Sequence, residues 1–224
     1  ENLSLYTSYA KSFLPHSGDQ FTVLDATSEA LAPEEFENLE AGVKWDITDA
    51  LALTGAVYRL DRNNTRATDP ISGNAVLSGK SRTEGVEFSL VGRVTDSLDV
   101  SLGYALQDGE IRATTTAAPA GRKLAQLPRH QASAWARYNF SKAFGLGLGV
   151  IHQSSQFATI SNHVRLPAFT RIDAAAYYDL TRDVTLQLNV ENLTDTDYFP
   201  SAHTDNNIST GRPLNAKLTL RVKF

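Results

Sequence analysis

The chain has 224 residues and a formal net charge of −4, and 42% of its residues are hydrophobic. No stretch approaches the ~18 consecutive apolar residues that a membrane-spanning helix requires, and no long basic block is present, which excludes a helical membrane protein and argues against nucleic acid as the main partner. There is no cysteine, so neither a disulfide framework nor a thiolate metal site can exist.

Apolar and polar residues alternate along most of the chain, and this period of two predicts β-strands. In the last eleven residues, 214–224, the alternation has no exception and ends on Phe224. Turn residues divide the pattern into about ten strands, each about as long as the nine to eleven residues that a tilted strand needs to cross a bilayer. In chain order the strands are predicted at roughly 1–10, 36–47, 51–61, 83–94, 98–109, 129–140, 144–155, 168–180, 184–194 and 213–224.

The connections between these strands alternate in length. Very short turns are predicted at 48–50, 95–97, 141–143 and 181–183, whereas the other connections are segments of roughly ten to twenty-five residues. Short turns on one rim and long loops on the other are typical of outer-membrane barrels. The fold class predicted is therefore all-β, a transmembrane antiparallel β-barrel.

The predicted strand 184–194 shows how the two faces differ. Its alternate residues form an apolar set and a polar set: Val184, Leu186, Leu188 and Val190 against Thr185, Gln187, Asn189 and Glu191. We expect the apolar face to contact lipid and the polar face to line an aqueous lumen, because charged residues are costly in a dry core. A soluble β-sandwich or lipocalin-like barrel also alternates, but strand length, the turn and loop pattern and the charged second face argue against it.

Several passages resemble the TonB-dependent siderophore receptors, in the order in which that family has them. They are Leu31-Ala32-Pro33-Glu34 followed by 37–44 (L-x-P-E … E-x-G-x-K), Arg82 to Glu87 (R-x-x-G-x-E), Leu127 to His130 (P-R-H), Asn189 to Asp195 with Tyr198 (N-x-x-N-L-x-D … Y), and the terminal aromatic Phe224. Within the family, the stretches 60–69 and 103–111 look most like the catecholate-receptor branch.

The resemblance implies the architecture of a larger receptor. Family members have a barrel of about twenty-two strands with an N-terminal plug inside it, and an N-terminal box that contacts the energy-coupling protein TonB. The chain resembles only the last ten or so strands. We therefore expect one unit, 1–224, that forms the C-terminal part of such a barrel, with the plug and the early strands absent.

The resemblance also implies a function and a location. The intact protein would be an outer-membrane receptor and transporter for ferric siderophores, driven by TonB, to which this chain contributes barrel wall and loops. It would hold no resident cofactor or metal and no catalytic residue, because the ferric siderophore is cargo. The expected partners are the siderophore, TonB through the absent N-terminal region, and outer-membrane lipid and lipopolysaccharide. We expect a monomer in the bacterial outer membrane with long loops outside and the C-terminus in the periplasm.

Basic and aromatic side chains in the long connections suggest where a ligand would bind. A basic vestibule would concentrate an anionic chelate such as a ferric catecholate by long-range steering, and aromatic side chains could stack on it. The candidate ligand-binding residues are Arg62, Arg66, Arg122, Lys123, Phe157, Arg165, Tyr198, Phe199 and His203. The same arginines could instead bind lipopolysaccharide phosphates on the outer rim or simply be solvated, and the aromatics could pack the loops.

Two other function classes remain open from the sequence. A complete ten-stranded outer-membrane enzyme would need a base and an orienting acid within hydrogen-bond reach, and only His203 with Asp205 or Asp197 is a candidate. The other class is a passive pore. Pairing between the first and last strands would indicate a closed ten-strand barrel. If these strands do not pair, the chain is part of a larger barrel.

Overall fold

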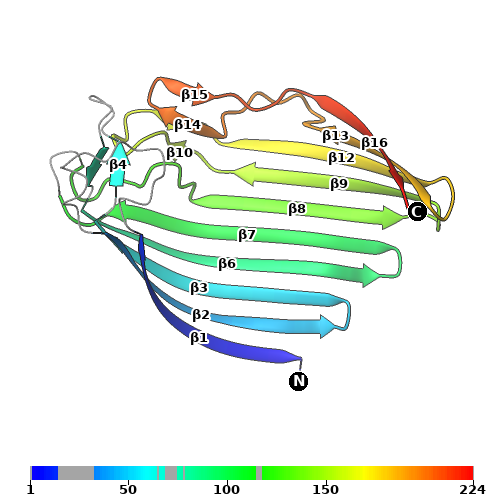
Figure 1. Ribbon diagram of the computed structural model, residues 1–224, viewed down its shortest axis with the longest axis horizontal. Coiled ribbons are helices and arrows are strands. Elements are labelled where there is room, and N and C mark those ends of the chain that lie inside the picture. Colours follow the sequence, from blue (N-terminus) through cyan, green and yellow to red (C-terminus); the bar gives the residue numbers. More distant parts are fainter. Residues whose placement is uncertain are drawn as a thin grey trace.

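The computed structural model describes residues 2–14, 33–64, 66–68, 75–77, 79–114 and 118–223. Ten long strands form one antiparallel sheet in the order β1-β2-β3-β6-β7-β8-β9-β12-β13-β16 (Figure 1). Their bounds are β1 Leu3–Leu14, β2 Glu34–Thr48, β3 Leu51–Asn63, β6 Lys80–Thr95, β7 Leu98–Ile111, β8 His130–Asn139, β9 Phe144–Gln153, β12 Phe169–Asp179, β13 Val184–Glu191 and β16 Asn215–Val222. The all-β fold and the ten predicted strands are confirmed.

The two ends of the sheet differ, as the connection lengths predicted. Tight turns join β2 to β3, β6 to β7, β8 to β9 and β12 to β13 at one end, here called the turn end. The described parts of the longer connections lie at the other end, the loop end, and include three short hairpins (Figure 1). These hairpins pair β4 Arg66–Thr68 with β5 Ala75–Leu77, β10 Gln156–Phe157 with β11 Arg165–Leu166, and β14 Ser201–Thr204 with β15 Asn207–Ser209. Within the described ranges, no helix is long and apolar enough to cross a membrane.

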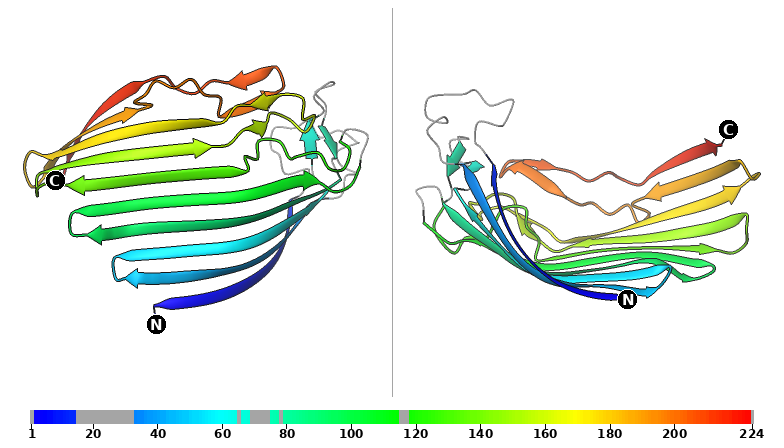
Figure 2. Two further views of the ribbon diagram at one scale, coloured as in Figure 1. Left: turned by 180° about the vertical axis from the view of Figure 1, so that it is seen from behind. Right: turned by 60° about the horizontal axis from the view of Figure 1, so that its bottom comes forward.

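The sheet is strongly curved and open. Figure 2 shows it as a trough, and β1 and β16 are its two edge strands, without pairing to each other. A closed ten-strand barrel would have joined these two strands. Because unpaired strand edges are not tolerated in lipid, the open trough fits one side of a larger barrel and not a complete small one.

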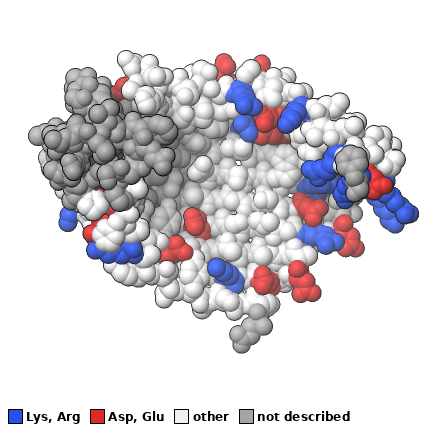
Figure 3. All heavy atoms as spheres, in the orientation of Figure 1, with Lys and Arg blue, Asp and Glu red and all other residues white. Residues whose placement is uncertain are grey.

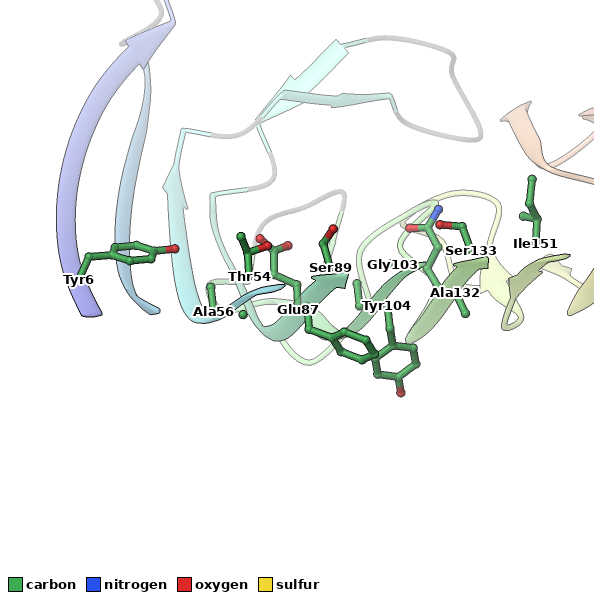
Figure 4. Close-up of a pocket in the computed structure, with 14 residues that line it drawn as sticks. Tyr6, Thr54, Ala56, Glu87, Ser89, Gly103, Tyr104, Ala132, Ser133 and Ile151 are labelled. Atoms are coloured by element: carbon green, nitrogen blue, oxygen red, sulfur yellow. The ribbon is translucent and has the colours of Figure 1, made fainter. Parts of the chain in front are cut away.

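The convex face of the sheet is apolar and exposed. In the register of β13 and β16, Leu186 pairs with Leu220 and Leu188 with Leu218. The exposed fractions are 39% for Leu188, 64% for Leu218 and 59% for Leu220. These leucines do not meet in a sealed centre. The strand register places them on the face of the sheet that carries Tyr104, which points away from the hollow (Figure 4), as predicted for the apolar residues.

The concave face of the sheet is polar and rich in small residues. Figure 4 shows Glu87 and Ser89 of β6 and Ser133 of β8 on this side, while Tyr104 of β7 points the opposite way. Aromatic rings lie flat over glycines of the neighbouring strand, as Trp135 does over Gly147 and Gly149 of β9; a Cβ atom added at either glycine would come within 2.5 Å of the ring. Glycine is therefore needed there for close packing along the inner wall.

Candidate ligand-binding site

Three connections at the loop end pack into one body, which we call the loop cluster: 112–129, of which the structure describes 112–114 and 118–129, together with 154–168 and 192–214. Two groups of buried apolar residues join them. The first consists of Ile111, Ala118 and Ile160, with Leu124 and Ala125 packed against it. The second consists of Ala158, Leu166 and Ala202, with Val164 and Phe199 packed against it. The first group joins the first two connections, and the second joins the last two.

Gln126 lies where the three connections meet. Its backbone N–H donates to the carbonyl of Phe157 at 2.8 Å. Its side-chain Nε2 donates to the carbonyl of Ala202 at 2.7 Å, and its Oε1 accepts from the N–H of Ala202 at 3.3 Å. The side-chain amide thus pairs with the main chain of β14 in the way that a neighbouring strand would.

Further hydrogen bonds link the same connections in pairs. Asn162 Nδ2 donates to the carbonyl of Lys123 at 2.9 Å, and the N–H of Lys123 donates back to Asn162 Oδ1 at 2.8 Å. The carboxylate of Asp205 accepts from the hydroxyls of Thr159 and Ser161, both at 2.7 Å. These bonds satisfy the side chains of Asn162, Thr159 and Ser161, whereas the buried Oε1 of Gln156 has no hydrogen-bond partner among the described residues.

Asn192 fixes the base of the last connection. Its side chain is fully buried and donates from Nδ2 to the carbonyls of Thr196 and Arg212, both at 3.0 Å, while Oδ1 accepts from the N–H of Thr196 at 2.9 Å. Its φ of 55° is in the left-handed region, which asparagine tolerates better than most residues. Asn192 of the N-L-x-D passage therefore holds the two ends of the connection 192–214 together, a structural role that the sequence did not predict.

Two connections of the loop cluster carry Phe157, Arg165, Phe199 and His203 among the predicted ligand-binding residues. Phe157 of β10 pairs in register with Arg165 of β11, and the Arg165 guanidinium carbon lies 5.7 Å from the centre of the Phe157 ring. Arg165 is exposed. His203 is exposed on β14, and Phe199 is partly buried against the second apolar group. A cation stacked on an aromatic face offers both charge and a flat apolar surface to an anionic aromatic ligand.

The side chain of Tyr198 mainly makes contacts within the protein. Only 7% of it is exposed, and its ring lies 4.7 Å from that of Phe169. Its hydroxyl accepts a hydrogen bond from Arg171 Nη1 at 3.0 Å. On its other side the ring lies so close to Gly211 that a Cβ atom there would clash with it. Little of Tyr198 is left to stack on a ligand.

The other basic candidates lie apart from this group. Arg62 Nη2 forms an ion pair with Glu34 at 2.7 Å, and Lys123 Nζ with Asp108 at 2.6 Å. Lys123 faces the convex side, since Asp108 shares the face of β7 that carries Tyr104. Arg122 Nη1 donates to the carbonyl of Ile160 at 3.4 Å. Arg66 lies in β4, and its side chain is outside the described part of the structure.

The geometry does not support an enzyme centre at His203. The acid nearest in sequence, Asp205, has both carboxylate oxygens engaged by Thr159 and Ser161. Among the described residues, no group of three or more histidine, aspartate or glutamate side chains is arranged to hold a metal ion. Neither a base held by its orienting acid nor a metal centre is thus found in the described ranges.

The concave wall carries a broad recess between β1 and β9. Its volume is about 530 Å³, and it is lined by small and polar side chains around Glu87, with Tyr6 of β1 reaching toward it from one side (Figure 4). Figure 3 shows charged side chains at the turn end, along the upper and lower edges and at the loop end, around a largely uncharged area in the middle of the molecule. The recess is a wide hollow in the wall, and it lies on the strands, away from the loop cluster.

An open antiparallel sheet with an apolar convex face, a polar concave face, short turns at one end and packed loops at the other defines part of an outer-membrane type of β-barrel. The family model described as "TonB dependent receptor-like, beta-barrel" matches residues 1–193. The chain belongs to this family, whose members are outer-membrane β-barrels.

Individual relatives agree with this assignment. The probable TonB-dependent siderophore receptor PiuA of Acinetobacter baumannii is 31% identical over 241 residues, covering 100% of this chain and 32% of PiuA. The catecholate siderophore receptor Fiu of Escherichia coli K12 is 32% identical over 238 residues, covering 100% of this chain and 31% of Fiu. The crystal structure of PiuA matches with a TM-score of 0.87 at 29% identity, over 100% of this chain and 34% of that one. The chain thus spans about a third of the length of these curated relatives.

Proposed function

We propose that the chain is the C-terminal barrel portion of a TonB-dependent receptor that takes up ferric siderophores. Family membership and relatives named as siderophore receptors support this proposal. In the intact receptor, further strands would complete a barrel of about twenty-two and would cover the edges of β1 and β16. TonB would act through the N-terminal region that this chain does not include.

The observation that carries the ligand assignment is the exposed Arg165 guanidinium stacked over Phe157 in the loop cluster. Ferric catecholates combine negative charge with aromatic rings, so this pair offers them both steering and stacking. Phe199 and His203 would complete the contact surface. We therefore infer a catecholate-type siderophore as the ligand of the intact receptor.

Binding to the full-length receptor tests this assignment. We expect iron(III) complexed with 2,3-dihydroxybenzoate to bind more tightly than iron(III) complexed with acetohydroxamate. Arg165→Ala should weaken catecholate binding about tenfold, which corresponds to ~1.4 kcal/mol. Arg182→Ala is the matched control, because Arg182 is an exposed arginine in a turn at the opposite end of the sheet. Equal affinity for both complexes, or none for either, would remove the catecholate assignment.

The orientation proposed for the intact receptor places the turn end and the C-terminus in the periplasm and the loop end outside the cell. The convex face would contact outer-membrane lipid and lipopolysaccharide, and the receptor would act as a monomer. In whole cells, an impermeant maleimide should label Asn206→Cys, which lies in the loop cluster, but should label Lys142→Cys at the turn end only after the outer membrane is permeabilised. The reverse labelling order would contradict this orientation.

A passive pore is the remaining alternative. The relatives are named as receptors, and a receptor filled by a plug should not conduct ions freely. In planar bilayers, the full-length protein should therefore stay closed. Steady open conductance would favour the pore and contradict the receptor.

A further inference from the structure

We propose that the loop cluster behaves as one rigid body, and that Gln126 is the positioning residue that holds its three connections in register. Two apolar groups and several hydrogen bonds already join these connections in pairs. Gln126 differs from those links because it contacts both of the other connections at once. The proposal concerns the chain itself, and only its ligand experiment rests on the proposed function.

The conformation of Gln126 supports a specific role. Its φ of 52° places the backbone in the left-handed region, which residues other than glycine and asparagine rarely adopt. Such a conformation persists where the surrounding contacts hold it. Here it allows the N–H of Gln126 to meet Phe157 while the side chain meets both main-chain polar groups of Ala202. A glutamine at this point thus acts as a three-way connector.

The remaining contacts make the cluster cooperative. Separating 154–168 from 192–214 would expose the apolar group around Leu166 and would strip Asp205 of both hydroxyl partners. Separating 112–129 from 154–168 would expose the group around Ile160 and break the paired bonds between Asn162 and Lys123. Links that must break together form a single opening unit.

The loop cluster is also hydrogen-bonded to the ten-stranded sheet, here called the wall. The N–H of Leu124 donates to the carbonyl of Gly109 in β7 at 3.0 Å, and the N–H of Asn192 donates to Asp173 in β12 at 2.8 Å. In the intact receptor, the three connections of the loop cluster would therefore move together. Phe157, Arg165 and His203 would keep fixed mutual positions, so a ligand would meet a preformed half-site in this part of the vestibule.

Distances between spin labels in the full-length receptor test the proposal without a ligand. One label is attached to each connection at an exposed position, using Ala120→Cys, His163→Cys and Asn206→Cys in pairs; this chain contributes no other cysteine. We expect narrow distributions for all three pairs. Gln126→Ala should broaden the distance between the labels at Ala120 and Asn206, because the lost side chain contacts Ala202, whereas Gln131→Ala on β8 should leave this distance narrow. Broad distributions in the parent protein, or a narrow Ala120–Asn206 distance in Gln126→Ala, would overturn the proposal.

A second variant distinguishes loss of the Gln126 hydrogen bond from general misfolding of the receptor. Gln126→Glu keeps the size of the side chain but cannot donate to the carbonyl of Ala202, so it should reproduce the broadening while the barrel keeps its heat-modifiable migration on gels. Iron(III)–2,3-dihydroxybenzoate is then added to the parent protein. Unchanged distances among the three labels support a preformed half-site, and independent shifts of single pairs contradict it. Failure to bind this complex affects the proposed function and leaves the distance test in the free receptor intact.

Discussion

The wall and the loop cluster are held together by different forces. The long strands are joined by a continuous backbone ladder, and most of their side chains remain at least partly exposed on one face or the other. In the loop cluster, apolar residues such as Ala118, Ala158 and Leu166 are almost completely buried, and side-chain amides bond to the main chain. The described interior of the chain therefore lies mainly in its loops.

This difference shows where each region obtains its stability. The loop cluster carries its own small core and is largely complete within this chain. The wall has two broad faces that the described residues do not cover, one apolar and one polar, which in the proposed receptor would be covered by lipid outside and by lumen contents inside. A change in the wall should therefore act through the surroundings, and a change in the cluster through local packing.

The largest expected effect comes from placing a charge on the convex face. Leu218→Arg should destabilise the full-length receptor in bilayers by about 2–4 kcal/mol, because a guanidinium near the membrane midplane loses its hydration. Thr219→Arg on the opposite face of β16 is the matched control and should cost far less. Unfolding by denaturant in lipid vesicles measures both. Equal effects would contradict the assignment of the faces.

A somewhat smaller effect is expected from Asn192→Ala in the loop cluster. The substitution removes three hydrogen bonds and leaves the carbonyls of Thr196 and Arg212 without this side-chain donor, at a cost of about 2–3 kcal/mol in local stability. The amide of Thr196 should then exchange with solvent more than tenfold faster, while the amides of β9 should keep their protection. Asn207→Ala, at an exposed position of β15, should change neither. Equal loss of protection in β9 would show that the two regions are not separable.

The smallest effect is expected where the two regions meet on the convex face. Lys123 and Asp108 form an ion pair at 2.6 Å, but both side chains are largely solvent-exposed. Exposed pairs contribute about 0.5 kcal/mol or less because of solvent screening and side-chain entropy. Lys123→Ala should therefore change thermal stability by no more than ~1 °C, and added salt should erase the difference. A loss comparable to that of Asn192→Ala would mean that this pair supports the cluster.

The strands of the wall could be predicted because apolar and polar residues alternate along each of them. All ten strands were found, and the deviations lie at their ends. β13 ends at Glu191, earlier than predicted, because Asn192 turns into the left-handed region. β1 continues to Leu14, because β2 already begins at Glu34 and offers it a partner. A pairing partner far away in sequence cannot be seen from one strand alone.

The candidate site was only partly predictable. Exposure of Arg165 and His203 fitted their place in long connections, but the packing role of Tyr198 depends on Gly211, thirteen positions away. Gln126 gave no local signal, since its partners come from two other connections. Asn192 did carry one, because Asn-Leu-Thr-Asp is rich in residues that tolerate left-handed turns. The resemblance drew attention to this passage without revealing that it closes a loop.

The open edge of β1 has a practical consequence for handling the protein. Twelve residues, Leu3–Leu14, pair with β2 on one side, and on the other side they pair with no strand among the residues that the structure describes. An isolated polypeptide of this length would offer such an edge at both β1 and β16. Copies of it would pair edge to edge and aggregate. Refolding should therefore start from the complete receptor gene product, in detergent or lipid.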